Sequence, residues 1–276
     1  MRTLTGKFFK ANFFVILMLA VALPAFAYAN ADEALVPASI INIASGTHVI
    51  AVDKDAHTLY LYESMQGPGS TPKLVKSFRI LTGKVVGDKV KEGDKKTPEG
   101  IYFFTKTIPG SELPGKYGVH AVVTDYPNKV DRLDKKTGSG IWFHGTDDPP
   151  RLERPRDSRG CVVALNKDVI EITRYINHNE TPIIVFDSID FILAEDAGAK
   201  RSSIIERLKE LKIIKWDGSD RDVFTILRHE KYLTVSVKSG DKLKIYYLRK
   251  SNNELKLIAE DSLGRTGKPK KQSARK

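Results

Sequence analysis

The residues best suited to chemistry are the only cysteine, Cys161, and His144, which lies seventeen residues before it. A cysteine nucleophile needs a base within hydrogen-bonding reach, and that base needs a group that fixes its tautomer. Gly160 precedes the cysteine and lets backbone amides approach a developing oxyanion. Because the loop between the two residues is rich in arginine, we expect a lowered thiol pKa. On spacing alone, a buried cysteine and a histidine hydrogen-bonded at a strand end remain the alternative.

Other chemistries find little support in the sequence. A single cysteine excludes an intramolecular disulfide framework and a thiolate-rich zinc cluster. Neither a phosphate-binding G-x-x-x-x-G-K-[ST] loop nor a dinucleotide-binding glycine fingerprint is present. We therefore expect no metal and no organic cofactor. His120 is the best rival histidine, because it also ends a predicted strand, and we place it in the site as a polar substrate contact.

Short strands must position these residues. Residues 48–62 predict two strands joined by an Asp-Lys-Asp turn, and residue 83 begins a polar loop that ends at residue 100. Further strands are predicted near residues 73–82, 101–107, 118–124, 139–144 and 182–186. Short strands with Gly and Pro between them favour a β-sandwich-like or barrel-like domain. Asn166 can cap a helix that runs to about Asn177.

A second unit begins near residue 195. Apolar residues at helical spacing predict a helix over residues 202–214. Strands are predicted near residues 223–228, 231–237, 242–249 and 254–259. These elements predict a small α+β accessory module over residues 195–260, followed by a basic, disordered tail over residues 263–276.

Length and charge bound the possible functions. The 276 residues are enough for one large or two small domains. The formal net charge is +11, but residues 1–27 hold three cations and residues 265–276 hold six, with no acid in either segment. A folded nucleic-acid binder carries its charge on a face of the domain, so we expect no nucleic-acid partner. The tail is either solvated or weakly associated with anionic membrane or wall polymer.

The N-terminus predicts export. Residues 1–10 are basic, residues 13–23 are apolar, and Pro24 is followed by the cleavage motif Ala25-Phe26-Ala27. This is the plan of a signal peptide over residues 1–27. The apolar run falls short of the roughly 20 residues that span a bilayer. We expect a soluble protein in the periplasm of a bacterium.

Four separate patches, in the right order, resemble the L,D-transpeptidase (YkuD-type) catalytic domain. The resemblance covers residues 47–187, and its first two patches are an opening hairpin and a stretch of the form TG…GD..TP.G.Y. The third is a histidine motif and the fourth is similar to an S-H-G-C nucleophile motif. The matching residues are Val52-Asp53 with Leu59–Glu63, Leu81–Lys84 with Gly93–Tyr102, Phe143–Thr146 and Ser158–Cys161.

The resemblance implies a mainly β fold with a short helix after the nucleophile, and an enzyme that needs no cofactor. By this resemblance, Cys161 is the nucleophile and His144 is the general base and then the general acid. The backbone carbonyl of Gly145 orients His144. The amides of Gly160 and Cys161 form the oxyanion hole.

The implied substrate is a peptidoglycan stem tetrapeptide. Attack by Cys161 releases D-Ala and leaves an acyl-enzyme. Transfer to the amine of a second stem gives a cross-link, which is L,D-transpeptidation. Hydrolysis gives a tripeptide, which is L,D-carboxypeptidation. A non-catalytic wall-binding module and a hydrolase of another wall-linked peptide remain open as alternatives.

The sequence departs from the family pattern at two positions. Arg159 replaces the usual histidine, and Val163 replaces the usual Arg or Asn two residues after the cysteine. An arginine at position 159 can hold a substrate carboxylate in bidentate fashion. We therefore place Ser158 and Arg159 among the substrate-binding residues. The alternative for Arg159 is a solvated charge that pairs with Asp157 or Asp147.

Overall fold

The computed structural model describes residues 35–64, 71–215, 224–230, 232–252 and 254–264. Strands dominate these residues and helices are few, so the predicted mainly β class is confirmed. The predicted signal peptide lies outside the described residues, as does the tail beyond residue 264. Within the described ranges, no helix has the length and apolarity that crossing a membrane requires.

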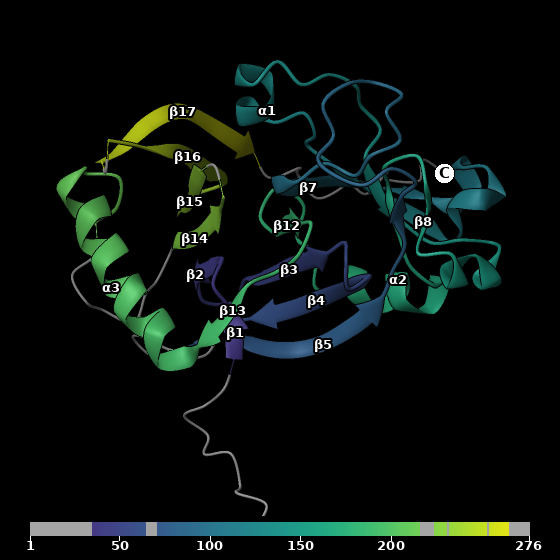
Figure 1. Ribbon diagram of the computed structural model, residues 1–276, viewed down its shortest axis with the longest axis horizontal. Helices are drawn as coiled ribbons and strands as arrows, with labels where there is room; N and C mark the ends of the chain where they lie inside the picture. Colours follow the sequence, from purple (N-terminus) through teal and green to yellow (C-terminus); the bar gives the residue numbers. More distant parts are fainter. Residues whose placement is uncertain (1–34, 65–70, 216–223, 231, 253, 265–276) are drawn as a thin grey trace, which may run out of the picture. The chain divides into compact units, whose positions relative to one another are not determined.

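The candidate site is built on an eight-stranded sheet. In spatial order the strands are β11 (Val162–Val163), β9 (Trp142–His144), β8 (His120–Thr124), β7 (Gly100–Pro109), β12 (Pro182–Phe186), β3 (His48–Asp53), β4 (Thr58–Glu63) and β5 (Lys73–Arg79). β11 runs parallel to β9, β12 runs parallel to β3, and the other neighbours are antiparallel. Figure 1 shows β3, β4 and β5 side by side at one edge.

The centre of this sheet is covered on both faces. All five residues of β12 are buried, which explains its unbroken apolar sequence. In β3, Ile50 and Val52 pack into one hydrophobic cluster, and Val49 and Ala51 pack into another. Side chains alternate between the two faces of a strand, so each face of β3 contributes to a separate core.

A second sheet packs against the first. It contains the four predicted C-terminal strands and a fifth, β2, from the N-terminal part of the chain. Its order is β17 (Glu254–Gly264), β16 (Lys242–Ser251), β15 (Tyr232–Ser239), β14 (Phe224–His229) and β2 (Ile40–Asn42). β17 extends two residues into the segment predicted as tail. The predicted boundaries of the catalytic and accessory domains stay a prediction.

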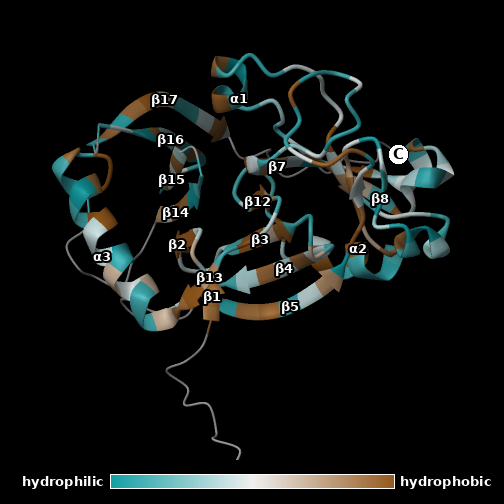
Figure 2. Cartoon of the chain, viewed as in Figure 1, coloured by the Kyte–Doolittle hydropathy of each residue, from teal (hydrophilic) through white to brown (hydrophobic). Residues whose placement is uncertain are grey.

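The helices differ from the sequence predictions at their ends. α2 (Asn166–Thr173) starts as predicted but ends four residues before Asn177, and Leu165 rather than Asn166 occupies its N-cap. α3 (Ala194–Glu210) begins eight residues before the predicted helix and packs Ile205 and Leu208 on the second sheet. Figure 2 shows brown and teal segments along α3, in keeping with one buried side. The apolar pattern located the buried face of α3 and not its ends.

The shortest strands and helices were not predicted from the sequence, because two to five residues are too few to show a periodic pattern. Four short strands form two small two-stranded sheets: β1 (Leu35–Pro37) pairs with β13 (Phe191–Leu193), and β6 (Thr82–Gly83) pairs with β10 (Arg156–Ser158). The others are α1 (Lys129–Leu133) and the 3₁₀ turns η2 (Gly110–Glu112), η3 (Gly115–Tyr117) and η4 (Pro149–Glu153).

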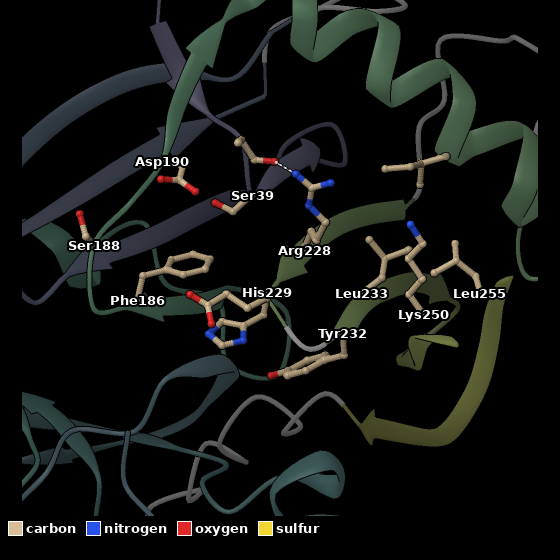
Figure 3. Close-up of a pocket in the computed structure, with 13 residues that line it drawn as sticks. Ser39, Phe186, Ser188, Asp190, Arg228, His229, Tyr232, Leu233, Lys250 and Leu255 are labelled. Atoms are coloured by element: carbon tan, nitrogen blue, oxygen red, sulfur yellow. Dashed lines mark hydrogen bonds between the residues drawn. The ribbon is translucent and has the colours of Figure 1, made fainter. Parts of the chain in front are cut away.

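A cleft of about 520 Å³ opens beside β14 and β15. The ring of Phe186 stacks on His229, with ring centroids 4.9 Å apart. Arg228 reaches across to the backbone carbonyl of Ala38 at 3.4 Å, and Lys250 and Leu255 lie on the opposite side (Figure 3). The cleft contains neither Cys161 nor His144.

One buried hydrogen bond joins the two sheets. The backbone N–H of Ile101 in β7 donates to the hydroxyl of Tyr232 in β15 at 2.7 Å. We expect Tyr232→Phe to lower the free energy of unfolding by about 1–3 kcal/mol, because it leaves this buried donor without its acceptor. Denaturant unfolding measures the change. The matched control is Tyr246→Phe in β16, which we expect to cost less. Equal losses in the two variants would contradict the account.

Candidate active site

The register of two neighbouring strands places Cys161 beside His144. In the parallel pair of β9 and β11, Phe143 lies opposite Val162 and His144 lies opposite Val163. Cys161 is therefore level with Trp142, two residues before His144. Because strand side chains alternate with a period of two, Cys161 and His144 face the same side. Both line one cleft of about 410 Å³.

His144 is held in one orientation and one tautomer. Its side chain is buried, with 3% exposure, at the end of β9. Nδ1 lies 2.6 Å from the carbonyl oxygen of Gly145. A carbonyl can only accept, so Nδ1 carries the proton and Nε2 is left as an acceptor. The ring of Tyr117 packs edge-on against the imidazole at a centroid distance of 4.9 Å. The carbonyl contact that the family resemblance implies for Gly145 is present.

The turn that presents Cys161 is fixed by Ser158. The Ser158 hydroxyl accepts the N–H of Gly160 at 3.0 Å and donates to the carbonyl oxygen of Cys161 at 2.7 Å. Its side chain is 2% exposed, and its single proton is used inside the turn. Ser158 therefore shapes the turn, where we expected a substrate contact. Gly160 does not offer the free amide that we expected in an oxyanion hole, because its N–H is already bonded.

Gly160 is needed for its backbone conformation. Its φ is +127°, a region that L-residues with side chains rarely adopt. A Cβ at this position would lie 2.7 Å from the carbonyl oxygen of Lys96 and 3.0 Å from Cδ1 of Ile141. Any other residue at position 160 would displace the turn that carries Cys161.

Asn166 is a supporting residue that sequence reasoning misassigned. Its side-chain Oδ1 accepts the backbone N–H of Val119 at 3.2 Å and that of Thr146 at 3.1 Å. A Cβ on Gly118 or Gly145 would collide with this oxygen, so only glycine fits at either position. The carboxamide thus ties the segment after Tyr117 to the segment after His144. An asparagine at a helix start is the ordinary signal of a cap, and it concealed this role.

Asp157 forms ion pairs with most of the cationic side chains in the cleft. Arg151 donates to its carboxylate from Nε at 2.9 Å and to its backbone carbonyl from Nη2 at 2.7 Å. Lys84 pairs with the same carboxylate at 3.1 Å, and Arg154 does so at 3.4 Å. Among the ion pairs of the described residues, none joins Arg159 to Asp157 or to Asp147. Arg159 lines the cleft with an exposed side chain.

His120 is not brought to the cleft. Its neighbour Ala121 lies directly opposite His144 in the pair of β8 and β9. Side chains alternate along a strand, so His120 points to the other face of the sheet. Burial lowers its pKa. A substrate contact by His120 stays a prediction that this placement does not support, because strand-end position does not specify which face a side chain occupies.

Burial keeps both central groups neutral. Burial lowers the pKa of His144 to about 4. The hydrogen bond to the Gly145 carbonyl raises this pKa, and the charges of Arg151 and Lys116 lower it further. Burial raises the pKa of Cys161, although a hydrogen bond with the backbone of Trp142 and the same two cations oppose this. The expected lowering of the thiol pKa is therefore wrong, since desolvation outweighs the cations. At neutral pH the site holds a thiol and a neutral imidazole.

Comparison with known proteins identifies the family. Residues 47–185 match the model of the L,D-transpeptidase catalytic domain (YkuD), and the chain belongs to this family. It is 28% identical over 129 residues to "Putative L,D-transpeptidase YafK" of Escherichia coli K12. That match covers 46% of each protein, so the chain spans about half the length of the curated relatives it matches.

Solved structures extend the likeness beyond the catalytic domain. Bd1075 of Bdellovibrio bacteriovorus is 27% identical, with a TM-score of 0.68 over 85% of this chain and 100% of that one. Pgp2 of Campylobacter jejuni, a helical cell shape determining protein, has a TM-score of 0.53 at 18% identity. That match covers 78% of this chain and 91% of Pgp2, and it shows likeness of fold.

The pKa of His144 should respond to the charge of Lys116. Lys116 is an exposed cation whose charge lowers the pKa of His144. We expect Lys116→Met to raise this pKa above about 4 while leaving it below the ordinary value of 6.5, because burial is the larger cause. NMR titration of the imidazole measures the shift. Lys106→Met, at an exposed position on β7, is the matched control and should change nothing. An unchanged His144 pKa in Lys116→Met would contradict the account.

Proposed function

We propose that the protein is a cysteine acyltransferase of peptidoglycan stem peptides, with L,D-transpeptidase activity. The observation that carries the proposal is the shared cleft, in which Cys161 and an imidazole with a free Nε2 face the same side of the sheet. These two groups supply the nucleophile and the oriented base that thiol acyl transfer uses, and in the resting site the thiol donates to the carbonyl oxygen of Gly140 at 3.4 Å. Membership of the L,D-transpeptidase family supports the same reaction.

In the proposed acylation, the donor is a stem tetrapeptide, and the attacked carbonyl belongs to the L-centre of the diaminoacyl residue before D-Ala. The Cys161 sulfur forms a bond to this carbonyl carbon while Nε2 of His144 accepts the thiol proton. The amide of Cys161 stabilises the oxyanion. The carbon–nitrogen bond then breaks, His144 returns the proton to the nitrogen of D-Ala, and a thioester remains on Cys161.

The acceptor decides the product. When the amine of a second stem attacks the thioester, His144 takes a proton from the amine, an amide forms and the thiol is restored. When water attacks, the product is a tripeptide, and the protein acts as an L,D-carboxypeptidase. Because His144 is neutral, its Nε2 can take the proton of either attacking group.

Carboxypeptidase activity is the second candidate, and Arg159 favours it. Arg159 stands where the family has histidine, and it exposes a guanidinium in the cleft. A guanidinium binds carboxylates in bidentate fashion, which suits the free end of a single stem. Val163, the second departure from the family pattern, is fully buried in β11 and does not line the cleft.

The proposed site of action is the bacterial cell envelope. The predicted signal peptide over residues 1–27 supports export to the periplasm, and the family supports a cell-wall substrate. The structural likeness to Pgp2, a helical cell shape determining protein, supports a contribution to cell-wall organisation and cell shape. The basic residues after Leu263 form either a solvated tail or a weak contact with anionic membrane or wall polymer.

A product assay by mass spectrometry tests the proposal. The protein is incubated with a disaccharide tetrapeptide, alone and with excess acceptor stem, beside Cys161→Ala. We expect a dimer that has lost D-Ala, formed only with Cys161. Tripeptide alone, even with excess acceptor, would establish the carboxypeptidase. If neither product depends on Cys161, the proposed activity is wrong and a non-catalytic wall-binding role gains support.

A further inference from the structure

The candidate active-site cleft carries an excess of positive charge. It is lined by five cationic side chains and two carboxylates: Lys84, Lys116, Arg151, Arg154 and Arg159, with Asp148 and Asp157. Charge of this sign and density selects anionic ligands and concentrates them near the reacting groups. The individual pairings show which cations remain for a ligand.

Three of the five cations form ion pairs within the protein. Lys84 and Arg151 pair with Asp157, and Arg154 pairs with both Asp157 and Asp148. Lys116 and Arg159 are the other two, and no ion pair among the described residues includes either of them. The carboxylate of Asp147 lies near Gly115, the residue before Lys116, yet no ion pair with Lys116 forms there.

Lys116 is the cation of these two that acts on the reacting groups. Its charge, with that of Arg151, affects the pKa of both His144 and Cys161. Its Nζ lies 5.2 Å from the ring centroid of Tyr117, and this ring packs on His144. The turn that carries Lys116 is closed by a 2.7 Å hydrogen bond from the N–H of Gly118 to the carbonyl of Gly115. Lys116 is therefore an exposed cation on a fixed support beside the nucleophile.

We propose that Lys116 is a specificity residue that binds the terminal carboxylate of the leaving D-amino acid. The inference rests on the proposed function and names the chemical group that the site selects. The carboxylate carbon of the leaving residue is two bonds beyond the scissile nitrogen, so it lies within about 4 Å of the attacked carbonyl carbon. A cation beside the nucleophile is in place to meet it. The cleft thus selects donors in which the scissile bond precedes the last residue.

The preference can be measured with one change to the substrate. A tetrapeptide stem that ends in D-alaninamide keeps the scissile bond and loses only the terminal charge. A charge-assisted hydrogen bond discriminates by about 10- to 100-fold in kcat/KM. We expect the protein to prefer the free acid over the amide by this factor. The assay follows the release of D-Ala or D-alaninamide by mass spectrometry.

Three variants assign the preference to Lys116. Lys116→Met should lower kcat/KM for the acid more than for the amide, so that the acid-to-amide ratio falls toward one. Lys116→Arg keeps the charge and should keep most of the preference. Lys106→Met removes an exposed lysine outside the cleft and should leave the ratio unchanged. A purely structural effect of Lys116 would change both substrates alike and would not alter the ratio.

The outcomes separate this inference from the proposed function. Equal activity of the wild-type protein on acid and amide would overturn the inference and leave the proposed function standing. A preference that survives in Lys116→Met would also overturn it, and would point to Arg159 as the carboxylate ligand. If no product from either substrate depends on Cys161, the proposed function fails, and the inference fails with it.

Discussion

The candidate site depends on one side-chain amide. Oδ1 of Asn166 accepts backbone N–H groups from Val119 and Thr146, two segments that the chain separates by more than twenty residues. One segment carries the Tyr117 ring that packs on His144, and the other includes the carbonyl that holds its Nδ1. The collisions that any Cβ on Gly118 or Gly145 would make with Oδ1 show how closely these segments approach. A shorter side chain at position 166 would leave two donors unpaired and the base loosely held.

Burial then determines the chemistry of the pair. The same packing buries His144 and half-buries Cys161, and the resulting desolvation keeps both groups neutral at neutral pH. The surrounding cations oppose the rise of the thiol pKa without overcoming it. Asp157 neutralises part of this positive charge. Lys116 and Arg159 line the cleft, where their charge is available to a substrate carboxylate. Burial therefore sets the protonation of the base and the nucleophile, whereas the cations of the same cleft interact with the charge of the substrate.

Much of this molecule is encoded in local patterns. The alternating runs that became β3 and β4, and the apolar run that became β12, predicted the mainly β fold, and the residue types together with the family motifs identified His144 and Cys161 as candidates. Long-range geometry was not predictable. Nothing near Ile40 in the sequence indicates that β2 joins the C-terminal sheet, and nothing near Asn166 indicates bonds to Val119 and Thr146. The thiol pKa was misjudged because sequence shows neighbouring charge and not burial. The face of the sheet on which His120 lies was not predictable either, because it depends on register with β9.

The central claim is that Cys161 forms a covalent bond to the substrate, and the intact mass of the protein tests it directly. The protein is mixed with a disaccharide tetrapeptide, quenched with acid within one turnover and weighed. The account predicts an added mass equal to the donor minus D-Ala, located on Cys161 by peptide mapping and absent in Cys161→Ala. Product formation by Cys161→Ala at the wild-type rate, or an adduct on another residue, would contradict the account.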